Sequence, residues 1–269
     1  MRLLLSLLFL FPVVVVGQAA AVGDRDTEGL IDDLQDLEQF VVGFHPTAHV
    51  DQFLADEAPA KFAGGVLGSK PPAVFGPMKE LVKRGPKALP LLLKHIDDQR
   101  PTRLVIKMEG VIMWARFTNR YNNRPRGIDP SFKNVEEDGD LPYVVKVGDV
   151  CLVILGQITN RPQVGVRYAP TGGVEVCSIA RFPEIPREAR ADWNRVSPEQ
   201  LYAHFVADLL AEDPEITDSP AMKRVRAYFP DREKDAQEAR KKANQALQHN
   251  DPSCHVSCFR TPRASWGRG

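Results

Sequence analysis

The chain has 269 residues, and its 35 Lys and Arg residues balance 35 Asp and Glu residues, so its formal net charge is zero. Nucleic acids and anionic membrane surfaces are held by clustered positive charge, so this balance argues against both as the main partner. A hydrophobic content of 43% is ordinary for a folded protein, and 22 prolines with 19 glycines predict long loops around a modest core.

The first 21 residues have the order of a signal peptide. Arg2 supplies a positive charge, residues 3–16 are almost entirely apolar, and small residues follow up to Ala21. A membrane anchor needs about 20 apolar residues, and this run is shorter. We therefore predict cleavage after Ala19 or Ala21, no membrane attachment after cleavage, and an exported protein that is periplasmic or extracellular.

The first helix of the mature chain is predicted to begin at Asp26 or Thr27 and to end at Gly43. One side of it is apolar at the helical period, through Leu30, Ile31, Leu34, Leu37 and Val41. The other side carries Asp32, Asp33, Asp36 and Glu38. Carboxylates near the start of a helix favour its dipole, so we interpret the acidic side as solvated rather than as a binding surface.

Two histidines follow this helix. If a helix began at the intervening proline, His45 and His49 would lie one turn apart, and with Asp51 they imitate a metal-ligand spacing. The Glu that zinc hydrolases place between two such His residues is missing. We therefore favour two partly exposed His residues in a loop, followed by a short helix over residues 50–55.

Residues 76–103 predict two short antiparallel helices. The first has Pro77 at its start and the apolar spacing of Met78, Leu81 and Val82, and it ends at Gly85. The second is opened by Pro86 and is ended by Asp97, Asp98 and Pro101. Its apolar stripe consists of Leu89, Leu92, Leu93 and Ile96. We expect the rest of the chain to pack against this pair.

The string LVKRGPKALPLL over residues 81–92 resembles a HEAT-type repeat unit, with Gly-Pro between the helices and Ala and Leu in the second helix. One such unit cannot bury both of its faces, so the resemblance implies neighbouring units stacked on it. It implies no activity.

Residues 103–113 are almost continuously apolar and rich in β-branched side chains, which favours a strand or an irregular segment over a buried helix. Residues 114–140 are polar and interleave four arginines with Trp114, Phe117 and Tyr121. Such a stretch could grip an anionic or carbohydrate ligand, but a surface loop is the simpler interpretation.

Residues 143–161 predict a short strand over 143–147 and then an apolar helix capped by Asp149. Val150, Cys151, Ile154, Leu155 and Ile158 are expected to face inward, and Gly156 indicates a close helix contact. Together with the helix pair, this segment resembles uncharacterised exported bacterial proteins. That resemblance implies a HEAT-like architecture and an exported location, and no reaction.

The C-terminal third is predicted to be helical after a small β hairpin over residues 164–179. Gly172 and Gly173 form a turn, because neither a dinucleotide-binding nor a Walker motif surrounds them. A helix over 197–211 begins with a capping box and places His204 and Asp208 one turn apart. A catalytic dyad is one interpretation, and an ordinary hydrogen bond on a helix face is the favoured one. Another short helix begins at Ser219.

Four cysteines complete the candidate chemistry. Cys151 is predicted to be a buried thiol or to pair with Cys177, while Cys254 and Cys258 could close a small loop. Those last two cysteines could instead hold zinc, with His249 and His255 as the other ligands. We favour no metal and no cofactor.

These observations predict a mainly α protein, an irregular α-α HEAT-like helical stack with a small β hairpin and a polar C-terminal helix. Residues 1–21 are the signal peptide, residues 22–230 the helical domain, and residues 231–269 a charged helix with a flexible tail. The predicted function is a non-catalytic exported scaffold or protein-binding module. The alternative is an extracytoplasmic hydrolase whose groups converge only in the fold, from among His95, Asp98, Asp149 and Arg161.

Overall fold

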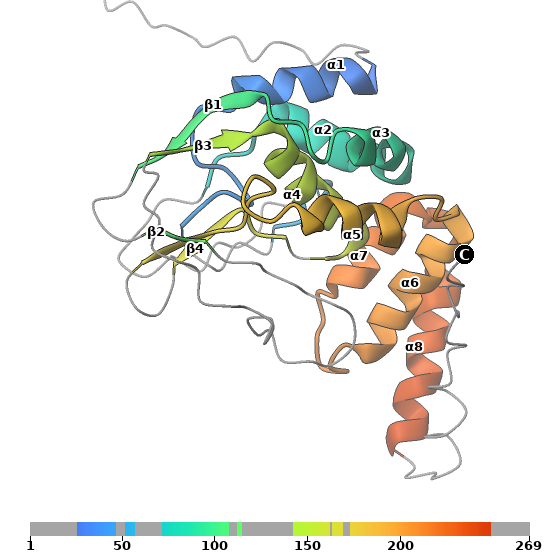
Figure 1. The fold of residues 1–269 in the computed structure, drawn as a ribbon. Coiled ribbons are helices and arrows are strands. Elements are labelled where there is room, and N and C mark those ends of the chain that lie inside the picture. The colour runs from blue at the N-terminus through green and yellow to red at the C-terminus, as the bar shows by residue number, and fades with distance from the viewer. Residues whose placement is uncertain are drawn as a thin grey trace, which may run out of the picture.

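The computed structural model describes residues 26–46, 52–56, 72–107, 112–114, 142–161, 163–168 and 173–248. Figure 1 shows helices arranged around a central one, with short strands on one side. The α-helices are α1 (Thr27–Asp32), α2 (Gly76–Arg84), α3 (Leu89–Lys94), α4 (Val147–Thr159), α5 (Glu184–Trp193), α6 (Pro198–Ala211), α7 (Pro220–Tyr228) and α8 (Glu233–Gln248). Three 3-10 helices are η1 (Asp33–Asp36), η2 (Gly85–Ala88) and η3 (Pro230–Arg232). The prediction of a mainly α protein is confirmed.

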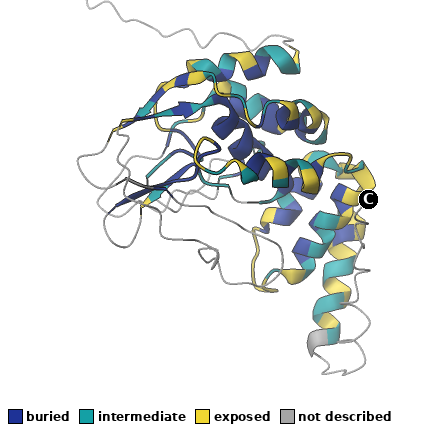
Figure 2. Ribbon diagram, viewed as in Figure 1, coloured by how far each residue is buried: buried dark blue, intermediate teal, exposed yellow. Residues whose placement is uncertain are grey.

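Helix α4 is the buried centre of the fold. Every residue from Val147 to Thr159 is buried except the half-buried Gln157, and Figure 2 shows this helix as a dark blue rod inside the molecule. Helices α2 and α3, the 3-10 helix η1 and strand β3 (Tyr143–Lys146) all contact it. An apolar helix of this kind is stable in water only when other elements cover it on all sides.

Both ends of α4 differ in detail from the prediction. The helix begins at Val147, and Asp149 lies in its first turn, where the carboxylate accepts a hydrogen bond from the backbone N–H of Lys146. At the other end Asn160 has φ 58°, and the backbone N–H of Arg161 reaches back to the Gly156 carbonyl at 2.9 Å. A Cβ at Gly156 would lie 2.2 Å from the Arg161 oxygen. The missing side chain of Gly156 therefore leaves room for the chain segment that follows α4, and not for a second helix as predicted.

The predicted first helix is shorter than expected. The Asp26 side chain caps α1 as predicted, but helical structure ends with η1 at Asp36, and Leu37 is already extended. Leu37 and Val41 are nonetheless buried, and Val41 forms a parallel bridge with Ala73. The apolar period predicted burial correctly and backbone conformation wrongly.

The helix predicted over residues 50–55 is also wrong where the structure describes it, because residues 52–56 form a turn.

The predicted helix pair exists, with one change. Helix α2 ends at Gly85, whose φ is 57° and whose missing Cβ would lie 2.4 Å from the Tyr228 ring. The 3-10 helix η2 intervenes before α3 begins at Leu89. Both α2 and α3 contact α1 and α4, as expected if the rest of the chain packs against this pair. HEAT-like stacking of this pair on further units remains a prediction.

The strands form two small sheets. Strand β1 (Pro101–Ile106) pairs antiparallel with β3, and β2 (Ile112–Trp114) runs parallel to β5 (Val174–Val176), which pairs antiparallel with β4 (Val166–Tyr168). The strand expected over residues 103–113 is therefore two strands in different sheets. The predicted hairpin over residues 164–179 corresponds to β4 and β5, which β2 extends.

The last helices form a layer at the lower right of Figure 1, in which α6, α7 and α8 contact one another. Ser197 and Gln200 make the predicted capping box at the start of α6, and the Ser219 side chain caps α7. Among the described side chains of α8, only Ala236 is buried, so this charged helix lies on the surface as predicted.

The predicted signal peptide over residues 1–21 lies outside the described residues, and so does the tail after residue 248.

The contact of α3 with α4 predicts a large effect of truncating a side chain in α3. Leu92 is fully buried, whereas its neighbour Leu91 is only partly buried against the core. We expect Leu92→Ala to lower the free energy of unfolding by about 2 to 5 kcal/mol, and Leu91→Ala by less than half as much. Urea denaturation followed by circular dichroism measures both. Equal effects of the two substitutions would contradict the central position of α3.

Candidate functional site

The four residues that sequence reasoning proposed for a hydrolase lie in three separate places. His95 and Asp98 contact each other just after α3, with ring Nδ1 and carboxylate Oδ2 3.2 Å apart. Asp149 is buried in the first turn of α4, and Arg161 follows the last turn of the same helix. A helix rises about 1.5 Å per residue, so the ten residues from Asp149 to the end of α4 at Thr159 span about 15 Å. One site cannot contain all four side chains.

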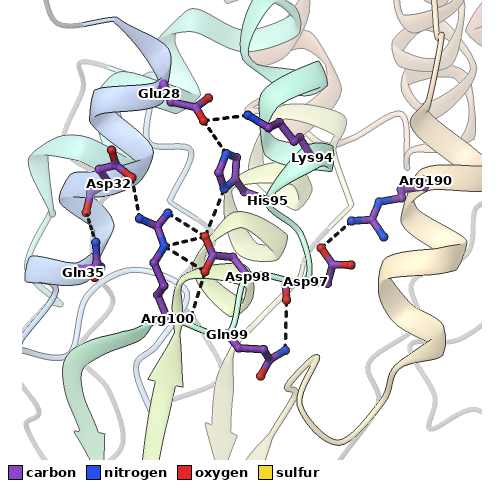
Figure 3. Close-up of polar contacts among 10 residues, drawn as sticks. All are labelled: Glu28, Asp32, Gln35, Lys94, His95, Asp97, Asp98, Gln99, Arg100 and Arg190. Carbon is purple, nitrogen blue, oxygen red and sulfur yellow. Dashed lines mark hydrogen bonds and ion pairs between the residues drawn. The ribbon is translucent and has the colours of Figure 1, made fainter.

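Figure 3 shows the first place, an ion-pair network between α1 and the end of α3. The second ring nitrogen of His95, Nε2, lies 2.9 Å from Glu28 Oε1, which also accepts a hydrogen bond from Lys94 Nζ at 2.9 Å. Hydrogen bonds from Lys94 and His95 hold the pKa of Glu28 below its usual value. Both nitrogens of the His95 ring thus lie within hydrogen-bond distance of carboxylates.

Arg100 connects the same network to the acidic side of α1. Its guanidinium donates to both oxygens of Asp98, at 2.7 to 3.1 Å, and to Asp32 Oδ1 at 2.7 Å. Burial favours the neutral form of Asp98, but the hydrogen bonds from Arg100 and His95 outweigh it and lower the pKa of that carboxyl. Arg103 pairs with Asp36 at 3.0 Å. Asp32 and Asp36 thus form ion pairs while their side chains remain 56% and 59% exposed, as expected for a solvated acidic side.

This network can hold elements together, and it can act as a base only after rearrangement. Asp98 orients His95 as a carboxylate orients the histidine of a hydrolase, but Glu28 occupies the ring nitrogen that would face a substrate. The His95 side chain is 16% exposed and that of Glu28 39% exposed. A substrate would therefore have to displace Glu28 first.

The second place is a buried cluster around Asp149. The carboxylate accepts hydrogen bonds from Tyr143 Oη at 2.5 Å and Ser178 Oγ at 2.8 Å, and from the backbone N–H groups of Lys146 and Ile179 at 2.9 Å. The hydroxyls of Tyr143 and Ser178 also contact each other. Burial raises the pKa of Asp149, and these hydrogen bonds oppose the rise. Because the partners come from β3, α4 and the chain after β5, the cluster joins three elements.

The third place surrounds Arg161. Its Nη1 atom donates to Asp208 Oδ2 at 2.9 Å, and Asn160 Nδ2 donates to the same oxygen at 2.8 Å. The guanidinium lies 5.8 Å from the centroid of the Trp193 ring, and the His204 ring lies 5.4 Å from the same ring. The contacts of Asp208 thus connect α6 to the end of α4. From the sequence we predict only that Asp208 lies one helical turn from His204.

Burial shifts the pKa values of this pair toward the neutral forms. It lowers the pKa of Arg161 to about 10 and raises the pKa of Asp208 to about 6, while the attraction between the two charges opposes both shifts. Burial also lowers the pKa of His204. The pair is ionised at neutral pH, but its desolvation costs more than the attraction returns.

The remaining predicted chemistry lies mostly outside the described residues. His45 is described, and its ring lies 6.4 Å from that of Phe40, whereas His49 and Asp51 are not described. The same holds for His249, Cys254, His255 and Cys258, and for the arginines of residues 115–141. Cys151 and Cys177 are both buried and are not joined by a disulfide, so the pairing of these two cysteines is wrong. Within the described ranges no group of three His, Cys, Asp or Glu residues could hold a metal ion.

A groove between α7 and α8 is the feature that sequence reasoning missed. It has a volume of about 420 Å³. It is lined by Thr217, Ser219, Met222, Arg226, Gln237, Arg240, Lys241, Asn244 and Gln245. On α8 the lining recurs at positions 237, 240, 241, 244 and 245, a polar stripe at helical spacing. That spacing was legible in the sequence, but the partner helix that turns the stripe into a groove was not.

Comparisons with known proteins add nothing to the geometry of these sites. Scans against family models, curated proteins and solved structures return no significant match to this chain. In the part of the chain that the structure describes, no helix combines the length and apolar character that crossing a membrane requires.

The raised pKa of Asp208 predicts a pH dependence of stability. A carboxyl that binds its proton more tightly in the folded state contributes stability below its unfolded pKa, and this contribution is lost as the pH rises through about 6. Between about pH 4 and about pH 7 the parent should therefore lose about 2 kcal/mol more stability than the Asp208→Asn variant. Urea denaturation of both proteins across this range is the measurement, and parallel pH profiles would contradict the assignment.

Proposed function

We propose that this chain is an exported, mainly helical scaffold that binds a protein partner through the layer of α6, α7 and α8. The observation that carries the proposal is the contrast between two kinds of charged surface. Around α1 and α3 the carboxylates and cations engage one another, as Glu28 does with Lys94 and Asp32 with Arg100. On α8 the side chains of Lys234, Asp235, Glu238, Lys241 and Lys242 are exposed beside a polar groove, and the one ion pair that the structure describes among them joins Glu238 to Lys242 at 4.0 Å.

The packing of the last three helices is consistent with such a role. Consecutive helices α6, α7 and α8 contact one another, which is the local arrangement from which helical repeat proteins build extended binding surfaces. The HEAT-like string at residues 81–92 points in the same direction, and the proposal extends it to a HEAT-like stack. Export is proposed from the order of charged, apolar and small residues over residues 1–21.

Site-specific photo-crosslinking tests the proposal. A photoreactive amino acid replaces Glu238 on α8, whose side chain is 72% exposed, and in a matched variant it replaces the exposed Glu38 beyond η1. In the extracytoplasmic fraction we expect one discrete protein adduct from position 238 and none from position 38. The adduct should form again between purified components. Adducts of equal yield at both positions, or none at position 238, would contradict a partner surface on α8.

The hydrolase is the second candidate, because His95 and Asp98 lie within hydrogen-bond distance of each other. If His95 serves as a base, the purified chain hydrolyses at least one member of a panel of ester, peptide and glycoside substrates. His95→Gln should then reduce that rate by about a hundredfold or more. A rate unaffected by the substitution would rule out this role for His95.

A further inference from the structure

The groove between α7 and α8 is lined by three cations and, among the described lining residues, by no carboxylate. Arg226 donates its Nε to Glu233 Oε1 at 2.7 Å, and its side chain is 55% exposed. Arg240 donates one terminal nitrogen to the carbonyl oxygens of Asp213 and Ile216, both at 3.0 Å. Lys241 is exposed and forms no ion pair with any residue that the structure describes. The groove therefore carries an excess of positive charge.

The groove holds its cations in different ways. The backbone carbonyls that accept from Arg240 are neutral, so they fix the position of the guanidinium without cancelling its charge. Glu233 neutralises one cation, and it also accepts from Gln237 Nε2 at 2.8 Å. Asp218, between the lining residues Thr217 and Ser219, pairs with Lys223 at 2.6 Å. The lining cations together with Glu233 and this pair therefore have a positive net charge, which favours an anionic ligand.

The shape of the groove selects among anionic ligands. Its lining on α8 extends from Gln237 to Gln245, and on α7 from Ser219 to Arg226. At about 1.5 Å per residue these spans are about 12 Å and about 10 Å. A single small anion would use cations that converge on one point, whereas this lining spreads its cations and amides along a line. An extended chain advances about 3.3 Å per residue, so about four residues would fill it.

The amide side chains of the lining suit a polypeptide. Gln237, Asn244 and Gln245 each offer both a donor and an acceptor, which the backbone of an extended segment can use at successive residues. Ile216 lies next to the lining residue Thr217 and is 40% exposed, so an apolar side chain of the ligand would find a contact at that end.

We propose that the groove between α7 and α8 binds an extended acidic segment of a partner protein, about four residues long, with an apolar residue at one end. This inference deepens the scaffold function proposed above and rests on it. Lys241 and Arg226 pair with carboxylates of the segment, Arg240 forms the fixed cationic wall, and the amides hold its backbone.

Peptide binding to the full mature chain tests the inference. The probe is a fluorescein-labelled hexapeptide of alternating Asp and Glu with one terminal Leu, and its partner probe carries Asn and Gln instead. Fluorescence anisotropy should show binding of the acidic peptide that weakens as salt is raised, and at least tenfold weaker binding of the amide peptide. Lys241→Gln and Arg226→Gln should each weaken binding by about fivefold.

Lys242→Gln is the matched control, because Lys242 is the adjacent exposed lysine on α8, pairs with Glu238 and does not line the groove. It should leave the affinity unchanged. Equal effects at positions 241 and 242, or equal binding of the two peptides, would overturn the inference. So would competition by inorganic phosphate or a single-stranded oligonucleotide that matches the peptide in affinity.

The two proposals fail separately. If crosslinking at position 238 captures a partner but the acidic peptide does not bind, the groove inference is wrong and the scaffold function stands. If the peptide binds with the expected variant pattern and no partner crosslinks, the acidic-peptide specificity of the groove stands and the scaffold function with its protein partner is wrong.

Discussion

The burial of α4 is the constraint on which the rest of the structure depends. A thirteen-residue helix with one half-buried position cannot face water on any side, so every neighbouring element must supply an apolar surface. Helices α2 and α3 contact it, and their Leu81, Val82 and Leu92 are fully buried. Gly148 fits the same requirement, because a Cβ there would lie 2.7 Å from the Ile96 oxygen. The turn after α3 can therefore approach the start of α4 closely.

Polar contacts at the two ends of α4 complete what apolar packing begins. At the start of α4 the carboxylate of Asp149 accepts hydrogen bonds from Tyr143 of β3 and from Ser178 after β5. At the end of α4, Asn160 and Arg161 donate hydrogen bonds to Asp208 on α6. Packing of smooth apolar side chains fixes volume better than it fixes register. Burying a polar group costs free energy unless all of its hydrogen-bond partners are in place. These contacts therefore fix how α4 is rotated about its axis and how far it is shifted along that axis relative to its neighbours.

The sequence predicted those features that depend on neighbouring residues. The Ser197 capping box, the Gly85 break and the apolar run of α4 are local, and all three are found. The prediction of a helix over residues 37–43 is wrong, because a helical apolar period is also compatible with burial in a non-helical segment. It could not reveal the network of Figure 3, since Glu28 and His95 lie 67 residues apart and only the packing of α1 on α3 brings them together.

The zero net charge of the chain and the cationic groove are compatible, because net charge is a sum and binding is local. At physiological ionic strength charges interact over a Debye length of about 8 Å. A ligand in the groove therefore experiences Arg226, Arg240, Lys241 and the neighbouring carboxylate of Glu233, and hardly the carboxylates of α1 (Figure 1). Nucleic-acid binders commonly make about six to ten phosphate contacts, which three cations cannot supply. The same number suits a segment with two or three carboxylates. The local charge thus limits the length of the anionic partner, as the length of the groove does.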